Sequence, residues 1–383
     1  MREAPLSTWA DQPSERRVRA STHMTASSAS TMKASPRSSR PVASSTAYLR
    51  AGSTPSQPKG TTASQGYDRG ATPETERMFY HARMRAEYVE EPCRSALNRV
   101  SGMGFRWSLN PYMGCAHRCA FCYVRGFERR ADRPSDDRYG SNVRVKVNVA
   151  EVLRAELTRR SWRRETVAVG AATDPYQPAE GRYRLTRACL VALGEYRTPI
   201  DLITRGPLIV RDIDVLAEAA RRAPVRVSVS VATLEEGLSV RLEPGVAPPR
   251  QRLRTLRLLT DAGIAAGVAV APVLPGLTDR PRDLAAVLGA AREAGATHAW
   301  SNVLNLRAGT REHFLDVLAR EWPEELDRYR RLYPDGGSGY LRPSDARPIE
   351  SRLAAVQRGA RIEDRRRIRL LPPPEPEQLR LLA

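Results

Sequence analysis

Residues Asn110–Tyr123, with the sequence NPYMGCAHRCAFCY, contain three of the five cysteines of the chain at the spacing C-x3-C-x2-C. Pro111 and Gly114 disfavour a regular helix here, so the stretch is predicted to be a ligand loop. Thiolates are soft donors that suit iron–sulfur clusters and zinc. A structural site normally has closed coordination, whereas three ligands leave one metal position free. The loop is therefore expected to hold a reactive metal centre.

The composition is that of a globular chain with a large excess of positive charge. The sequence has 383 residues, of which 41% are hydrophobic and 27% charged, and a formal net charge of +19. Such an excess favours contact with polyanions, so nucleic acid is a candidate partner. The odd number of cysteines argues against a disulfide framework, and no stretch approaches the roughly 20 apolar residues of a membrane span. We expect a cytoplasmic protein without a signal peptide or membrane contact.

The chain is expected to divide into segments of different composition. The first is rich in Ser, Thr, Ala, Pro and Arg and has no sustained periodicity, which predicts disorder. The polar run 125–139 is expected to wrap around the surface. The expected segments are a disordered basic tail over 1–75, a lead-in over 76–106 with a helical pattern at 74–85, a core over 107–310, a C-terminal helical extension over 311–346, and a basic tail over 347–383.

The core shows a repeated alternation of apolar runs and helical patterns. Near-continuous apolar strands that alternate with helices indicate a parallel sheet covered by helices. An extended segment over 143–147 and a helix over 149–160 follow the polar run. The six predicted strands are 107–109, 166–170, 199–204, 225–231, 265–273 and 298–306. The predicted helices that follow them are 186–197, 211–222, 249–262, 281–294 and 311–332, the last broken near Pro323.

Two closures of this sheet are compatible with the pattern, an open doubly wound sheet and a barrel. The sequence has no G-x-G-x-x-G after its first strand and no Walker motif, so nothing supports a dinucleotide or nucleotide site of the Rossmann kind. A complete or partial barrel places ligands on the loops after the strand ends. The cysteine loop follows the first strand, which is such a position.

The sequence resembles the radical S-adenosylmethionine (SAM) superfamily, and within it the branch related to spore photoproduct lyase and DNA repair photolyase-like proteins. The signature C-x3-C-x-aromatic-C is matched by Cys115, Cys119, Phe121 and Cys122. The resemblance covers roughly residues 95–345 and implies an α/β fold, a partial (β/α)6 TIM-like barrel. The further motifs that carry it are Thr173–Glu180, Thr204–Arg205, Arg211–Asp212, Leu242–Pro244 and Ala271–Gly276.

The resemblance implies a radical SAM enzyme. A [4Fe–4S] cluster would be held by Cys115, Cys119 and Cys122, with S-adenosylmethionine on the free iron. Electron transfer from an external donor of the flavodoxin or ferredoxin type would cleave the cofactor and give a 5′-deoxyadenosyl radical, which acts on a substrate. The cofactor carries this chemistry, and the protein supplies orientation and a dry cavity.

Further cofactor contacts are carried over by position. Phe121 is expected beside the adenine, and Tyr123 follows the third cysteine. Arg205 matches a basic position that pairs with the cofactor carboxylate, and Ser230 matches a polar residue near its methionine or ribose. Asp174 and Glu180 lie where the superfamily often holds the amino group. The alternatives are a strand-end ion pair for Arg205 and Asp174, and simple packing for Tyr123.

One departure from the family pattern and two alternatives remain at this point. In spore photoproduct lyase a cysteine near the end of the second strand donates hydrogen to the product radical, but the corresponding residues here are Ala171-Ala172-Thr173. The three cysteines could instead form a Cys3His zinc site with His117. A nucleic-acid-binding protein with a structural cluster or zinc and no turnover is the second functional class. Cys189 is expected to be a buried structural thiol.

Overall fold

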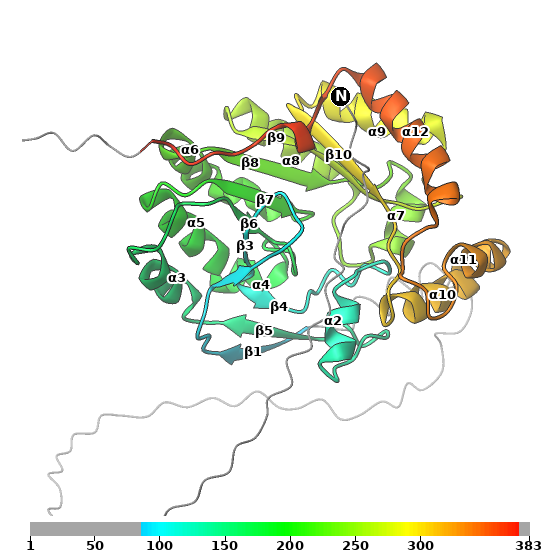
Figure 1. Ribbon diagram of the computed structural model, residues 1–383, viewed down its shortest axis with the longest axis horizontal. Helices are drawn as coiled ribbons and strands as arrows, with labels where there is room; N and C mark the ends of the chain where they lie inside the picture. The colour runs from blue at the N-terminus through cyan, green and yellow to red at the C-terminus, as the bar shows by residue number, and fades with distance from the viewer. Residues whose placement is uncertain (1–85, 375–383) are drawn as a thin grey trace, which may run out of the picture. The chain divides into compact units, whose positions relative to one another are not determined.

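The computed structural model describes residues 86–374 of the chain (Figure 1). The predicted disordered tail over 1–75, the predicted helix over 74–85 and the last residues of the 347–383 segment lie outside the described residues. The described lead-in contributes two strands, β1 and β2, that the sequence pattern did not predict.

Eight strands form one mostly parallel sheet in the order β11-β10-β9-β8-β7-β6-β3-β2. The strands from β3 to β11 run parallel to their neighbours, and only the pairing of β2 with β3 is antiparallel. The order has two ends, so the barrel is partial, and the six predicted β-α units are confirmed. The strands are β2 (Leu97–Arg99), β3 (Trp107–Leu109), β6 (Val167–Val169), β7 (Ile200–Thr204), β8 (Val225–Ser230), β9 (Ala265–Val273), β10 (His298–Val303) and β11 (Glu363–Asp364).

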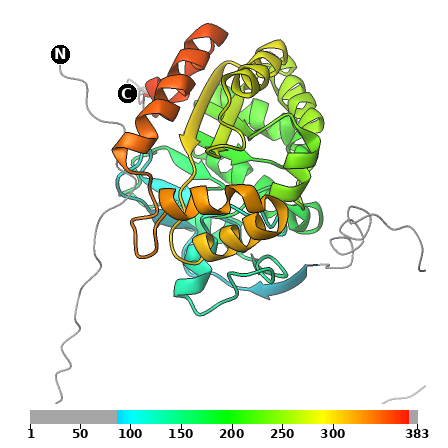
Figure 2. The same ribbon diagram turned by 90° about the vertical axis from the view of Figure 1, so that its right-hand side faces the viewer.

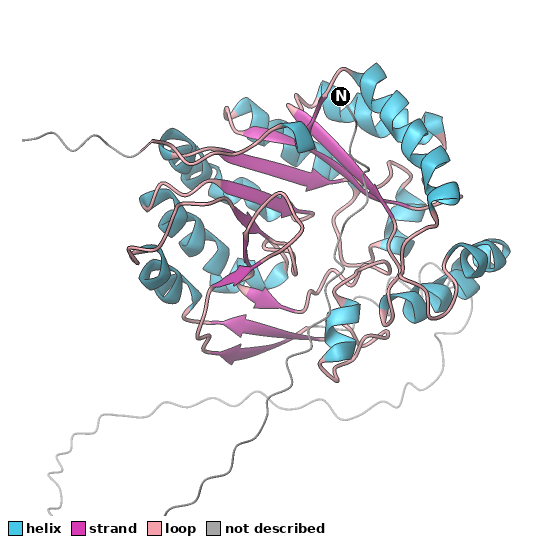
Figure 3. Cartoon of the chain, viewed as in Figure 1, coloured by secondary structure: helices cyan, strands magenta, loops and turns pink. Residues whose placement is uncertain are grey.

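Helices flank the outer side of this sheet, while the strands lie inside (Figures 1 and 3). Neighbouring helices pack on each other as well as on the sheet, α5 between α3 and α6 and α9 against β9. The outer helices are α3 (Val149–Leu157), α5 (Leu185–Glu195), α6 (Ile213–Arg222), α8 (Pro249–Asp261) and α9 (Pro281–Glu293), with the 3-10 turn η1 (Pro207–Asp212) before α6. The predicted positions of these helices are confirmed to within a few residues.

The strand β8 shows why the barrel has two different faces. Its three valines alternate with Arg226, Ser228 and Ser230, because successive side chains of a strand point to opposite faces. The valines belong to the main hydrophobic core beneath the helices, and the polar residues are also buried, on the opposite face. The interior of the barrel is therefore polar along this strand, with Arg226 at its beginning and Ser230 at its end.

A second, three-stranded sheet supports the cysteine loop. β5 (Asn142–Lys146) pairs with β1 (Glu87–Glu91) in parallel and with β4 (Tyr112–Met113) in antiparallel orientation. The cysteines follow β4 directly, and α2 (Arg125–Arg130) begins three residues after the last of them. The polar run 125–139 was predicted to wrap around the surface, and this is wrong for its two ends, since Arg125 and Tyr139 are buried.

The C-terminal part contains helices on two sides of the sheet. α10 (Thr310–Glu321) and α11 (Leu326–Leu332) lie beside each other, joined by the turn η2 (Pro323–Glu325), as the predicted break at Pro323 requires (Figure 2). α12 (Pro343–Ala360) packs against α9. The predicted boundary at 346/347 falls inside α12, so the segment 347–383 does not begin as a tail. The short helices α4 (Pro178–Tyr183) and α7 (Glu236–Leu242) and the 3-10 turn η3 (Arg365–Arg367) complete the fold.

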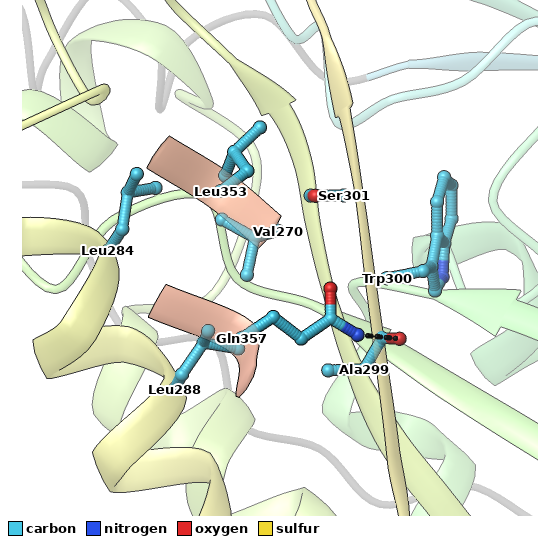
Figure 4. Close-up of a pocket in the computed structure, with 8 residues that line it drawn as sticks. All are labelled: Val270, Leu284, Leu288, Ala299, Trp300, Ser301, Leu353 and Gln357. Carbon is cyan, nitrogen blue, oxygen red and sulfur yellow. Dashed lines mark hydrogen bonds between the residues drawn. The ribbon is translucent and has the colours of Figure 1, made fainter. Parts of the chain in front are cut away.

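A small cavity lies between α9, α12 and the strands β9 and β10 (Figure 4). Gln357 of α12 donates a hydrogen bond of 3.1 Å to the carbonyl oxygen of Ala299 there. No cysteine comes from these elements. The lining residues are Val270, Leu284, Leu288, Ala299, Trp300, Ser301, Leu353 and Gln357. Within residues 86–374, no helix combines the length and apolar character needed to cross a bilayer.

Candidate metal centre and cofactor site

The cysteine loop is a tightly packed backbone segment. Cys115 and Cys119 are buried and Cys122 is partly buried. Gly114 has a φ of +83°, which favours glycine, and a Cβ atom there would lie 2.9 Å from the carbonyl oxygen of Asn142. Gly140, with a φ of +78°, would place a Cβ atom 2.2 Å from the carbonyl oxygen of Cys115. Both glycines are thus required by the close approach of β5 and its preceding turn to the loop.

The loop offers three thiols, a set of soft donors that suits an iron–sulfur cluster. Among residues 86–374, no three His, Cys, Asp or Glu side chains converge as ligands of one ion. The thiolates of a [4Fe–4S] cluster bind different irons and do not have to converge on one point. His117, the fourth ligand of the zinc alternative, is buried near both Cys115 and Asp174: its Nδ1 lies 3.4 Å from Asp174 Oδ2, without the geometry of a hydrogen bond.

The loop after β6 holds the cysteine loop in place through Thr173 and Gln177. The Thr173 hydroxyl donates to the carbonyl oxygen of Gly114 at 2.7 Å, and the Gln177 amide donates to the same oxygen at 3.1 Å. The Gln177 Oε1 accepts from the N–H of Ala116 at 3.0 Å. Gln177 is fully buried. The predicted Thr173–Glu180 motif therefore contacts the predicted ligand loop, as parallel strands that end at the same edge require.

Asp174 is buried and accepts hydrogen bonds from three donors. Its Oδ1 accepts from the Thr204 hydroxyl at 2.6 Å and from the N–H of Tyr176 at 2.9 Å, and its Oδ2 accepts from the N–H of Arg205 at 2.7 Å. Burial acts to raise the pKa of Asp174, but His117 and these donors outweigh it and lower the pKa to about 2. Asp174 therefore joins the ends of β6 and β7 and fixes the backbone at Arg205.

Arg205 belongs to a buried chain of charges behind Cys119. Its Nε donates to Glu243 Oε1 at 2.7 Å and its Nη2 donates to the carbonyl oxygen of Ala271 at 2.9 Å. Glu243 Oε2 accepts from Arg252 at 2.8 Å. The Arg205 guanidinium lies 5.6 Å from the centre of the Phe121 ring. Burial acts to lower the pKa of Arg205, but the sulfur of Cys119 and Glu243 outweigh it and raise the pKa. The structure thus brings Phe121, Arg205 and Asp174 together near the cysteines.

Glu180 has a different environment from Asp174. It lies on α4, fully buried, and its carboxylate accepts from the Tyr112 hydroxyl, from the N–H groups of Thr186 and Arg187, and from the Arg211 guanidinium. Four donors satisfy both oxygens. These contacts join β4, α5 and η1, and they give Glu180 a structural role, with no oxygen left for a cofactor amino group.

Ser230 and Tyr123 are the remaining predicted contacts. Ser230 is buried at the end of β8, and its carbonyl oxygen accepts from Arg252 at 2.8 Å. Tyr123 is 41% exposed and packs edge-on against Phe127, with ring centres 5.6 Å apart. Tyr123 therefore packs on α2, and its contact with the cofactor stays a prediction. Cys189 is fully buried in α5 and belongs to the main core, as predicted.

Two residues of the site were missed in the sequence. The buried Arg125 donates to four carbonyl oxygens, those of Arg118, Cys119, Ser135 and Asp136. The Tyr139 hydroxyl lies 3.5 Å from Cys122 Sγ. Both residues lie at the ends of the polar run 125–139, and its composition predicted a surface segment. The available signal was the position of Arg125 three residues after Cys122.

The motif Leu242-Glu243-Pro244 contacts the loop through its backbone. The carbonyl oxygen of Leu242 accepts from the N–H of Ala120 at 2.8 Å, and the N–H of Gly245 donates to the carbonyl oxygen of His117 at 3.1 Å. A Cβ atom at Gly245 would lie 2.5 Å from the carbonyl oxygen of Ala116. The motifs after several strands therefore meet at one site, built around three cysteines.

A partial barrel with a three-cysteine loop after its first strand defines a radical SAM protein. The family model described as "Radical SAM superfamily" matches residues 109–288, and the chain belongs to this superfamily. Its members use a [4Fe–4S] cluster and S-adenosylmethionine, and the chain is a radical SAM enzyme with an unspecified reaction.

Similar proteins include an uncharacterized protein of Mycobacterium tuberculosis (strain ATCC 25618 / H37Rv), 42% identical over 298 residues, which cover 76% of this chain and 87% of that protein. An uncharacterized protein of Acidianus two-tailed virus is 29% identical over 240 residues, 58% of this chain and 77% of that protein. A structure of a spore photoproduct lyase variant with bound AdoMet and dinucleoside spore photoproduct has a TM-score of 0.56 at 16% identity, covering 76% of this chain and 84% of that chain. This likeness shows a shared fold.

Proposed function

We propose that this enzyme binds its cluster through Cys115, Cys119 and Cys122 and cleaves S-adenosylmethionine reductively. The observation that carries the proposal is the three-cysteine loop, fixed by contacts from the loops after β6 and β8. When bound, the reduced cluster and S-adenosylmethionine supply a 5′-deoxyadenosyl radical that abstracts hydrogen from a substrate. The residues of this chain hold, orient and shield that chemistry.

Arg205 is proposed to pair with the cofactor carboxylate. Two of its guanidinium nitrogens are held by Glu243 and Ala271, which leaves Nη1 as the nitrogen proposed for the cofactor. The side chain is 20% exposed, so part of the guanidinium group is accessible although it is held by Glu243 and Ala271. A guanidinium is planar and has several N–H groups, so Arg205 can donate to Glu243 with one nitrogen and to the cofactor carboxylate with another.

Phe121, Ser230 and Asp174 are proposed to act around the cofactor by shape and position. Phe121 contacts the Arg205 guanidinium with its ring face and packs in the core behind Cys119. Asp174 accepts hydrogen bonds from the protein on both oxygens, so its proposed role is to position the backbone of Arg205.

All five cysteines are free of disulfides, which agrees with the proposed cytoplasmic location, where thiols stay reduced.

Anaerobic reconstitution tests the proposed function. We expect the purified full chain to bind iron and sulfide, and to form 5′-deoxyadenosine from S-adenosylmethionine when a strong one-electron reductant is added. A flavodoxin or ferredoxin is the proposed electron donor and should replace the chemical reductant. A protein that binds one zinc ion and no sulfide would overturn the proposal and favour the zinc alternative.

We propose nucleic acid as the substrate class, supported by the net charge of +19 and by the fold shared with a lyase whose structure holds a dinucleoside lesion. The residues Ala171–Thr173 offer no thiol for hydrogen donation, so any repair reaction would need another donor. The test measures 5′-deoxyadenosine with no DNA, intact DNA and ultraviolet-damaged DNA. Stimulation by damaged DNA alone supports a repair role. Salt-dependent DNA binding without any turnover favours the binding-protein alternative.

A further inference from the structure

We propose that Tyr139 sets the reduction potential of the cluster by donating a hydrogen bond from its hydroxyl to the sulfur of Cys122. This inference rests on the proposed function, since it requires a cluster on the three cysteines. Tyr139 lies 17 residues beyond Cys122 in the chain, and its hydroxyl oxygen is 3.5 Å from Cys122 Sγ. It is therefore a positioning residue that acts through a ligand.

The direction of this hydrogen bond follows from the chemistry of the ligand. A thiolate bound to iron has no proton to donate, so the phenol must be the donor and the sulfur the acceptor. Tyr139 is 2% exposed, so water does not compete with the sulfur for the hydrogen bond of its hydroxyl.

Arg125 fixes the Tyr139 ring in this position. Its guanidinium lies 4.5 Å from the ring centre and donates to the carbonyl oxygens of Ser135 at 2.9 Å and Asp136 at 2.6 Å. The same guanidinium donates to the carbonyl oxygen of Cys119 at 3.3 Å. The N–H of Tyr139 donates to the carbonyl oxygen of Asp136 at 2.9 Å. Arg125 thus ties the turn that carries Tyr139 to the turn that carries the cysteines.

The physical effect on the cluster has a definite sign. Reduction adds one negative charge to a centre that already carries three thiolates. A hydrogen bond to a ligating sulfur withdraws charge from it and stabilises the reduced state more than the oxidised state, which makes the potential less negative. Tyr139 therefore eases reduction of the cluster, the step on which cleavage of the cofactor depends.

The test compares the midpoint potential of the cluster in the wild type and in Tyr139→Phe, with reconstituted full-length protein and a redox titration followed by visible absorbance and electron paramagnetic resonance. We expect a more negative potential in the variant at unchanged iron and sulfide content. The matched control is Tyr333→Phe, which removes a buried hydroxyl that donates to the carbonyl oxygen of Leu304 at 2.7 Å rather than to sulfur. Its potential should equal that of the wild type.

A second replacement keeps the inference testable if Tyr139→Phe does not hold a cluster. Site-specific incorporation of 3-fluorotyrosine at position 139 keeps the ring and strengthens the donor, so the potential should become less negative. A purely structural role would not give shifts of opposite sign for the two replacements. Equal potentials in all loaded variants would overturn the inference, whereas a wild type without any cluster would overturn the proposed function instead.

Discussion

Glu243 joins the buried guanidinium of Arg252 to the partly buried guanidinium of Arg205 behind the cysteine loop. Its two oxygens accept from Arg205 at 2.7 Å and from Arg252 at 2.8 Å, and the carboxylate is almost completely buried. Burial acts to raise the pKa of Glu243, but the two arginines outweigh it and lower the pKa. Removing the charge would leave the buried Arg252 and the partly buried Arg205 without their common partner, which is more costly than losing an ion pair in water.

We therefore expect Glu243→Gln to destabilise the folded apoprotein by about 3 kcal/mol, measured by urea unfolding at pH 7. The matched control is Glu236→Gln. Glu236 forms a pair with Arg250 at 3.2 Å in which both side chains are more than half exposed, and its loss should change the free energy of unfolding by less than about 1 kcal/mol. Equal effects of the two substitutions would show that the buried chain of charges is not what holds this region.

At the level of single residues, the sequence predicted the cysteine ligands better than it predicted the hydrogen bonds between residues far apart in the chain. The spacing of Cys115, Cys119 and Cys122 is local, so it could be read directly. Arg125 and Tyr139 could not be predicted, because a buried arginine in a polar run is recognisable only once the carbonyl oxygens that satisfy it are known. Glu180 was predicted as a cofactor contact from its position in a motif, but its four donors come from three other elements.

At the level of elements, the C-terminal segment 363–370 closes the beginning of the barrel strands. β11 pairs with β10, and Arg365 of η3 reaches Asp201 of β7 at 2.6 Å. Arg226 of β8 donates to the same Asp201 at 2.7 Å and to the carbonyl oxygens of Arg365 and Ile368. Asp201 is therefore the anion that ties this segment to the sheet.

Asp201 predicts a pH dependence of stability. Burial acts to raise the pKa of Asp201, but Arg365 and Arg226 outweigh it and lower the pKa below its usual value. A carboxyl with a lowered pKa contributes stability that is present above the unfolded pKa of about 3.9 and is lost as the pH falls through the folded value. We expect Asp201→Asn to unfold about 3 kcal/mol more easily than the wild type at pH 7.

The difference between wild type and Asp201→Asn should shrink as the pH is lowered below about 3.9, because the wild-type carboxyl then becomes neutral as well. Chemical unfolding of both proteins between pH 7 and pH 3 measures it. Asp335→Asn is the control, since Asp335 is 92% exposed and its pair with Arg311 should contribute less than about 1 kcal/mol. A difference that stayed constant with pH would contradict the role given to Asp201.

The helix α12 could not be predicted for a physical reason. α12 buries only Ile349 and Leu353 and contains Pro348, so neither its apolar pattern nor its composition marks a helix. Its stability comes from packing on α9, which a reading of local periodicity does not include. The strands β6 and β9 were predictable because almost all of their residues are buried, which gives continuous apolar runs of recognisable length.

At the level of the whole molecule, the hydrophobic core beneath the helices is separate from the cysteine loop. The main core includes Cys189 but none of the three clustered cysteines, whereas Cys119 packs with a second cluster of apolar residues that includes Phe121. The loop itself is fixed by protein groups, among them Arg125 and Gln177. The fold should therefore not depend on the cluster, in contrast to small metal domains that unfold without their metal.

Two cysteine substitutions should separate cluster binding from folding. Cys119→Ala should bind little iron after reconstitution and yet keep the far-UV circular dichroism of the wild-type apoprotein. Cys189→Ala should bind iron like the wild type but unfold about 1–2 kcal/mol more easily, because it leaves a space in the main core. Full iron content in Cys119→Ala would contradict its assignment as a ligand. Loss of folded structure in that variant would show instead that the loop and the barrel fold as one unit, since a core that is independent of the loop has no reason to respond to a change within it.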